Sequence, residues 1–490
     1  MKENKVKRNH FFTVIYNIIN SYFRIFIPML MLFIFKAEIR VSEHIIKIFI
    51  VSIIFLLFSA LTNILKWKKT IYYIYEGKIY SKKGIFFIKE KEIQISNIYS
   101  VDLEQKFINR MLNIAKIKID TGNSSENEAE IELFLKLHEA KSIKNKLTGK
   151  VCNEELNKKE NLKENYYKLD KKSLILYGLT KVKFGIGFVV ILTVYNFIDD
   201  YLSFILKDEL LKINDIVNSS TIRNYSFDTL IKGILLFLIL YLIIIILFSV
   251  IKSFIKLYDY SISRSDSNIN IKYGLFDVKN YSFDIEKISG VFITQTFIQQ
   301  ILNLKTIEVE VVGYGNEKNE VKVLYPLVNE NKMNEILSNI LYDYYKVNKV
   351  NKVQNSTKFR FIRVRFIVGL IIQIILFFVF YKFNLVIYSS VGLLIILYMC
   401  LDGYFEYRNS GYYLNDKLIV LQYGGFKKRR AMVLLNKVES AMLNQSVFQK
   451  NKKLNDFGIV IQGNSFGKEI KTKNLNEKDG LIIFNKLFSN

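Results

Sequence analysis

Residues 266–295 read DSNINIKYGLFDVKNYSFDIEKISGVFITQ, and this stretch has two counterparts elsewhere in the 490-residue chain. Aligned without gaps on Gly274, it matches the sequences around Gly84 and Gly424 at fixed offsets from the glycine. The matched sets are an acid eight residues before the glycine (Glu76, Asp266, Asp416), an isoleucine five before (Ile79, Ile269, Ile419) and a glutamine twenty-one after (Gln105, Gln295, Gln445). Such self-similarity is the signature of an internal repeat, so we expect three copies of one module.

Each copy reads as a β-rich module that ends in a helix. Segments at 70–75, 78–82, 84–89 and 114–120 are rich in β-branched and aromatic residues, and glycine-containing turns separate them. Helical patterns close the copies at 130–147, 329–345 and 477–488. The positions fourteen and seventeen after the repeat glycine should lie in the core; they are Ile98, Ile288 and Val438, then Val101, Val291 and Ala441.

Six apolar runs alternate with the modules, at 11–35, 45–65, 184–198, 230–251, 366–381 and 385–401. A bilayer core of about 30 Å requires roughly 20 helical residues, and lysine or arginine at the ends of shorter runs can reach the interface. None of the runs has a clean polar stripe with the helical period, which disfavours six ordinary core helices. The runs therefore predict three transmembrane hairpins, each followed by one module.

Charge predicts the orientation of these hairpins. The segment 199–229 inside the second pair has six acidic against three basic residues, whereas lysine and arginine flank the pairs on their module sides. Basic residues stay on the cytoplasmic side of a membrane. We therefore expect a multi-pass protein with both termini and all three modules in the cytoplasm.

The predicted organisation is a membrane α plus β protein. Transmembrane hairpins occupy 11–65, 174–251 (with an extracytoplasmic loop at 199–229) and 359–401, modules occupy 66–149, 252–346 and 402–490, and linkers occupy 150–173 and 347–358.

This organisation resembles bacterial plasma-membrane proteins with pleckstrin-homology-like domains of the YdbS/YdbT type. The resemblance rests on the order of hairpin and module and on the element Ile-x-x-Val-x3-Gln, which runs from Ile98 to Gln105 and from Ile288 to Gln295. Five residues after the glutamine the family commonly has arginine; this chain has Arg110, Gln300 and Lys450 there. The resemblance implies a module of about seven antiparallel strands capped by one C-terminal helix. It also implies a smaller membrane partner with one such module, or self-association, and a role in envelope stress or antimicrobial-peptide tolerance.

The sequence carries no signal for an enzyme. The three histidines (His10, His44, His138) and the two cysteines (Cys152, Cys400) fall in separate segments, without the spacing of a zinc or redox site. Phosphate-binding glycine loops and hydrolase or metalloprotease motifs are missing. We therefore predict no catalytic residue, no metal and no cofactor, and interpret the modules as interaction or scaffolding units beneath the membrane.

The net charge of +25 favours an anionic partner. A basic stretch, Lys427-Lys428-Arg429-Arg430, follows the repeat glycine of the third module, where it would either contact anionic lipid headgroups or form an ordinary solvated hairpin. Nucleic acid is a poorer partner, because the basic residues are not interleaved with aromatic ones. We interpret the repeat signature as structural; it consists of Gly84, Gln105, Gly274, Gln295, Gly424 and Gln445.

A transporter or lipid-handling protein is the alternative, with the six helices packed around a path. It requires polar residues within the spans to converge, and the sequence offers Asn17, Asn20, Arg24 and Gln373.

Overall fold

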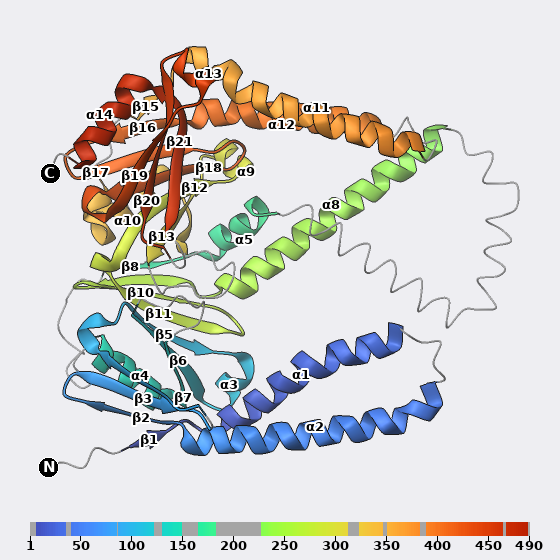
Figure 1. Ribbon diagram of the computed structural model, residues 1–490, viewed down its shortest axis with the longest axis vertical. Helices are drawn as coiled ribbons and strands as arrows, with labels where there is room; N and C mark the ends of the chain where they lie inside the picture. The colour runs from blue at the N-terminus through green and yellow to red at the C-terminus, as the bar shows by residue number, and fades with distance from the viewer. Residues whose placement is uncertain are drawn as a thin grey trace, which may run out of the picture.

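The computed structural model describes residues 6–35, 41–85, 87–121, 130–148, 165–182, 227–311, 323–345, 350–382, 389–463 and 467–488. Its strands and short helices form a column of modules, and the long helices project from this column toward one side (Figure 1). The predicted combination of apolar helices with antiparallel β-modules is confirmed.

The long helices are α1 (Phe12–Phe35), α2 (Val41–Lys69), α8 (Phe227–Leu257), α11 (Lys358–Lys382) and α12 (Val391–Asn409). Within the described ranges, three stretches are long and apolar enough to cross a membrane: Ile50–Lys69, Ile239–Leu257 and Asn355–Lys382. α1 packs along α2, and α11 packs along α12. α8 instead packs against the short helix α5 (Lys171–Thr180). The predicted span at 184–198 and most of the loop at 199–229 lie outside the described residues.

The three modules repeat one order of strands. Module 1 has β1 (Lys7–Arg8), β2 (Ile71–Tyr75), β3 (Lys78–Lys83), β4 (Lys89–Gln94), β5 (Ser100–Gln105), α3 (Phe107–Met111), β6 (Ile114–Asp120), β7 (Ile131–Lys136) and α4 (Leu137–Leu147). Module 2 has β8 (Asn165–Lys168), β9 (Ser261–Ser265), β10 (Asn268–Tyr273), β11 (Val278–Asp284), β12 (Ile288–Gln295), α9 (Phe297–Ile301), β13 (Lys305–Val311), β14 (Val323–Val328) and α10 (Glu330–Ile340). Module 3 has β15 (Asn351–Lys352), β16 (Gly411–Leu414), β17 (Leu418–Tyr423), β18 (Lys428–Leu434), β19 (Val438–Asn444), α13 (Val447–Lys450), β20 (Leu454–Ile461), β21 (Lys468–Asn476) and α14 (Glu477–Phe488).

The first strand of each module precedes its hairpin, where we expected linkers. β8 lies inside 150–173 and β15 inside 347–358, and each pairs with the strand that follows the hairpin. Strands of two to four residues are too short to show alternation, so the sequence did not distinguish them from a linker. The predicted helix at 130–147 begins only at Leu137, because the residues before it alternate and pair with β6 as strand β7.

Each module gives its first four strands to one sheet and its last three to another, and the sheets cross the module boundaries. The strand orders are β7-β6-β5-β11-β10-β9-β8 and β14-β13-β12-β18-β17-β16-β15. We call the β5–β11 pairing the first joint and the β12–β18 pairing the second joint. Both have the same register, because Gln105 lies opposite Val278 and Gln295 opposite Lys428. The remaining sheets, β1-β2-β3-β4 and β19-β20-β21, stand at the two ends of the column.

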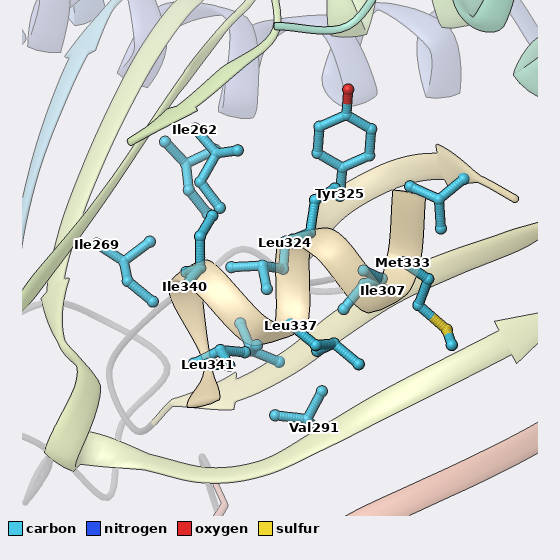
Figure 2. Packing of buried hydrophobic residues seen from close by; sticks show 14 of the residues in the cluster. Ile262, Ile269, Val291, Ile307, Leu324, Tyr325, Met333, Leu337, Ile340 and Leu341 are labelled. Atoms are coloured by element: carbon cyan, nitrogen blue, oxygen red, sulfur yellow. The ribbon is translucent and has the colours of Figure 1, made fainter. Parts of the chain in front are cut away.

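The core of module 2 shows how the helix closes each module. Met333, Leu337 and Ile340 project from α10 onto the sheet residues Val291 and Ile307 (Figure 2). Burying a side chain of this size stabilises the fold by about 1.5–3 kcal/mol. The same cluster continues across the second joint to Leu418, Val420 and Met432 of module 3, so this joint is packed as well as hydrogen-bonded.

Candidate anion site at the second joint

The repeat glycines close the same turn in each module. Gly84, Gly274 and Gly424 have φ angles of 131°, 115° and 97°, a region that other residues disfavour. A Cβ atom at any of the three would clash with the carbonyl oxygen of the residue three positions further along. The glycine therefore fixes the turn that leads into β4, β11 or β18.

The repeat glutamines make one hydrogen bond that recurs three times. Nε2 of Gln105, Gln295 and Gln445 donates to the backbone carbonyl nine residues further along, at 3.0, 2.9 and 2.9 Å. The bond joins the end of the fifth strand to the start of the sixth. This geometry favours a structural interpretation of the glutamines rather than a ligand contact.

The position five residues after each glutamine holds the joint together. Arg110 Nη1 donates to the Leu275 carbonyl at 3.0 Å in the first joint, and Gln300 Nε2 donates to the Phe426 carbonyl at 2.8 Å in the second. Both acceptors lie in the glycine turn of the following module. Lys450 occupies this position in module 3.

The basic stretch is divided between two environments. Lys427 and Arg429 are exposed, whereas Lys428 and Arg430 are half-buried at the second joint. Successive side chains of a strand point to opposite faces, so Lys428 and Arg430 share one face of the sheet. There they line a cavity of about 250 Å³ together with Lys305 of β13; its other lining residues are Ile293, Gln295, Asn303 and Glu330.

The cavity holds more positive than negative charge. Lys305 pairs with the Glu330 carboxylate, but the Glu330 side chain is 58% exposed and its field is partly screened. Burial and then the nearby Arg430 and Lys428 lower the pKa of Lys305 to about 8. Burial and Arg430 also lower the pKa of Lys428. Glu330 is the first residue of α10, so the electropositive end of that helix faces the same space. An anion with several oxygen atoms would accept hydrogen bonds from this set of donors.

The first joint has the same backbone without these three cations, and Lys144 of α4 instead donates to the Asn280 carbonyl and side chain. Positions equivalent to Lys428, Arg430 and Lys305 are occupied there by Val278, Asn280 and Ala115. A different cavity lies beside this joint, of about 130 Å³ and lined by Glu104, Gln105, Lys106, Asp277, Val278 and Lys279; only Gln105 and Val278 are equivalent to lining residues of the second-joint cavity. The fold of a joint therefore does not require three cations.

The second joint lies where module 3 meets its hairpin. The ring of Phe426 stacks on Tyr398 of α12 with centroids 4.9 Å apart, and packs edge-on against Phe297 of α9 at 5.4 Å. The Phe426 backbone N–H donates to Asp402 Oδ1 of α12 at 2.8 Å. Lys428 follows two residues later, so one end of the cavity lies on the membrane side of the module.

Sequence reasoning identified Lys428 and Arg430 but not Lys305 or Glu330. The two missed residues are isolated charges in a strand and at a helix start, and no local pattern separates them from the many other charges in the chain. Only the pairing of β12 with β18 brings them together.

The polar residues of the alternative do not converge among the described residues. Arg24 and Asn20 are exposed on α1, whereas Gln373 of α11 lies against Gly392 of α12, in a different hairpin. Across the described ranges no group of three or more His, Cys, Asp or Glu side chains is placed to hold a metal ion.

Comparison with known proteins agrees with the repeat. The sequence model of the bacterial PH domain matches three times, at residues 25–151, 222–344 and 365–485. A curated relative, described as "UPF0699 transmembrane protein YdbT" from Bacillus subtilis (strain 168), is 21% identical over 498 residues, which cover 97% of each chain. No solved structure matches. Each match includes part of a hairpin and the module after it, and together the matches span most of the sequence. The chain is thus a membrane protein that belongs to the bacterial PH domain family.

Proposed function

We propose that this protein is a non-enzymatic, multi-pass plasma-membrane protein whose cytoplasmic PH-like modules act as interaction units, and that the second joint binds the phosphate of an anionic lipid headgroup. The observation that carries the proposal is the cluster of Lys305, Lys428 and Arg430 around one cavity, against the single carboxylate of Glu330. The neutral residues at the same places in the first joint support a role for this charge beyond folding.

The short helices that follow the repeat glutamines support a position of the modules against the bilayer. Each exposes a large apolar side chain: Met111 of α3 is 74% exposed, Ile301 of α9 is 65% and Phe448 of α13 is 66%. Each also contacts or adjoins a membrane helix. Arg360 Nη1 of α11 donates to the Phe448 carbonyl at 2.7 Å, Phe297 packs on Phe405 of α12, and Lys106, which precedes α3, donates to Tyr16 Oη of α1 at 3.1 Å. Apolar side chains at the foot of a membrane helix enter the interfacial layer, which would bring the headgroups to the level of the cavity.

Orientation and partners follow from the same proposal. The acidic loop at 199–229 and the basic flanks support cytoplasmic termini and modules. The scaffold would hold a smaller membrane protein with one PH-like module, or a second copy, under the bilayer. A role in envelope stress or antimicrobial-peptide tolerance, which the family resemblance implies, would use both the lipid site and this scaffold.

The test replaces the three cations of the second joint with the residues found at the equivalent positions of the first joint, giving a transplanted variant. The variant Lys305→Ala, Lys428→Val, Arg430→Asn carries residues that an equivalent joint already tolerates, so the fold should persist. The matched control, Lys427→Ala with Arg429→Ala, removes charge from the exposed positions of the same stretch. Full-length protein in neutral nanodiscs is titrated with short-chain phosphatidylglycerol, short-chain phosphatidylcholine and inorganic phosphate.

Charged hydrogen bonds each contribute about 1.5–3 kcal/mol, so the transplanted variant should bind phosphatidylglycerol at least about tenfold more weakly than wild type. The control should bind phosphatidylglycerol like wild type, and phosphatidylcholine should bind to none of the three proteins. Equal binding by wild type and the transplanted variant would refute the site. Tight binding of inorganic phosphate with no preference for the lipid would refute the headgroup as its ligand.

A further inference from the structure

The last sheet of the column has an uncovered edge. β5 and β12, the fifth strands of modules 1 and 2, each lie between their own sixth strand and a strand of the next module. β19 is the equivalent strand of module 3 and pairs with β20 on one side. Among the described residues no strand pairs with its other side.

The edge strand β19 lacks the cover that the equivalent strands β5 and β12 have. All residues of β5 and β12 are buried, whereas none of β19 is fully buried. Val101 and Val291 are 1% and 0% exposed, but Ala441 at the same position is half-buried because no neighbour covers it. The edge residues Ala441-Met442-Leu443 carry no charge and no proline, the usual means of protecting an edge.

The closing helix of each module forms the second half of a joint. In the first joint Lys144 of α4 reaches over β11, and its Nζ donates to the Asn280 carbonyl at 2.8 Å. In the second joint Leu337 of α10 packs in one cluster with Val420 and Met432. Each incoming sheet therefore meets the helix that closes the preceding module.

The residues of the incoming sheet match that helix in polarity. Below the polar face of α4 the incoming residues are Asn268, Asn270 and Ser282. Below the apolar face of α10 the residues at the same positions are Leu418, Val420 and Met432. On α14 the position of Lys144 and Leu337 is occupied by Phe484, which is half-buried, so this helix presents an apolar side chain where an incoming sheet would pack.

A second copy of this chain does not offer a matching surface at its other end. In module 1 the equivalent positions are Lys78, Tyr80 and Glu92, and Lys78 pairs with Glu92 at 2.6 Å on the surface. β4 itself begins Lys-Glu-Lys-Glu, a pattern that protects an edge strand from pairing. A charged surface placed against Phe484 would lose its hydration without compensation.

We infer that β19 and α14 form a docking site for a PH-like module of a separate polypeptide, which adds its edge strand antiparallel to β19. The register of the two existing joints would place its residue four after the turn glycine opposite Gln445. Its outward residues at the positions of Leu418, Val420 and Met432 would be apolar. The inference deepens the proposed interaction role and does not depend on the lipid cavity.

The experiment is photo-cross-linking from the edge, with the full-length chain in its native membrane. A benzophenone amino acid replaces Asn444 on β19, and in a control replaces Glu92 on the exposed edge β4. Cross-linked peptides are identified by mass spectrometry. The expected product joins position 444 to the strand after the turn glycine of a PH-like module in another polypeptide, with little product from position 92.

A second variant tests the contribution of the helix. Phe484→Lys introduces the residue that α4 carries at the equivalent position, Lys144, so folding should be retained, and the product from position 444 should fall at least tenfold. The transplanted second-joint variant should cross-link like wild type, which separates this site from the lipid site. Four results would overturn the inference. They are a product no stronger than that of the position-92 control, a product with a second copy of this chain, a product outside a PH-like module, and a product whose yield does not change when Phe484 is replaced by lysine.

Discussion

The lowered pKa of Lys305 would make the proposed anion binding at the second joint depend on pH. The site needs the ammonium form of Lys305, and the pKa of this group in the unliganded protein is about 8. At pH 7 the group is protonated, whereas at pH 9 only about one molecule in ten retains the proton. The sign is therefore a loss of affinity as pH rises through 8, of about tenfold between pH 7 and pH 9.

A lipid with one fixed charge isolates this effect. Phosphatidylglycerol has a phosphodiester whose charge does not change in this range, so calorimetric titration of the full-length protein at pH 7, 8 and 9 reports the protein group alone. Lys305→Arg provides the control, because arginine keeps its charge throughout; its decline should be shallower than that of wild type, since Lys428, whose pKa is also lowered, still titrates. A flat wild-type profile, or the same decline in Lys305→Arg, would refute the assignment of the pH dependence to Lys305.

Three further predictions concern the repeat and the topology. Gln295→Leu removes, at a buried position, the donor to the Leu304 carbonyl and should lower the free energy of unfolding by about 1–3 kcal/mol, whereas Gln445→Leu at an exposed position should lower it less; denaturation of detergent-solubilised protein compares the two, and equal losses would contradict this. Gly274→Ala places a Cβ against a carbonyl oxygen at positive φ and should lower the thermal midpoint by several degrees, so an unchanged midpoint would contradict the turn geometry. In a variant without Cys152 and Cys400, an impermeant maleimide on intact cells should label cysteine at Asn218 but not at Asn161, and the reverse pattern would overturn the orientation.

The repeat was predictable because its signals are local and occur three times. The repeat glycine is required by a backbone with φ > 0, and the repeat glutamine bonds to a carbonyl of its own module. Because both interactions lie within one module, the two residues keep the same spacing in every copy. The alternation of apolar runs with β-rich segments likewise predicted the combination of membrane helices and modules.

The joints were not predictable from the same signals. β11 pairs with β5 although the two strands lie far apart in the sequence. At this joint, for example, the Phe107 N–H donates to Asp277 Oδ1 across a separation of 170 residues. No periodicity within a strand records which distant edge will cover it. Ala441 illustrates the limit: its sequence position predicted a core residue, but it is half-buried, because in the described part of the chain no strand pairs with the outer side of β19.

Only two of the charged residues of the candidate site, Lys428 and Arg430, were predicted from the sequence. The basic stretch drew attention to Lys428 and Arg430 as charge, but strand alternation and the β12–β18 pairing decide that these two face the cavity while Lys427 and Arg429 remain exposed. Lys305 joins them from β13, and its role depends on burial, which a sequence does not display.

The most direct test of the account is a single-particle density map of the full-length chain in nanodiscs that contain phosphatidylglycerol. The account predicts phosphate density inside the second joint, within hydrogen-bonding distance of Lys305, Lys428 and Arg430, and none in the first joint beside Val278 and Asn280. An empty second joint, with the lipid bound elsewhere on the modules, would contradict it.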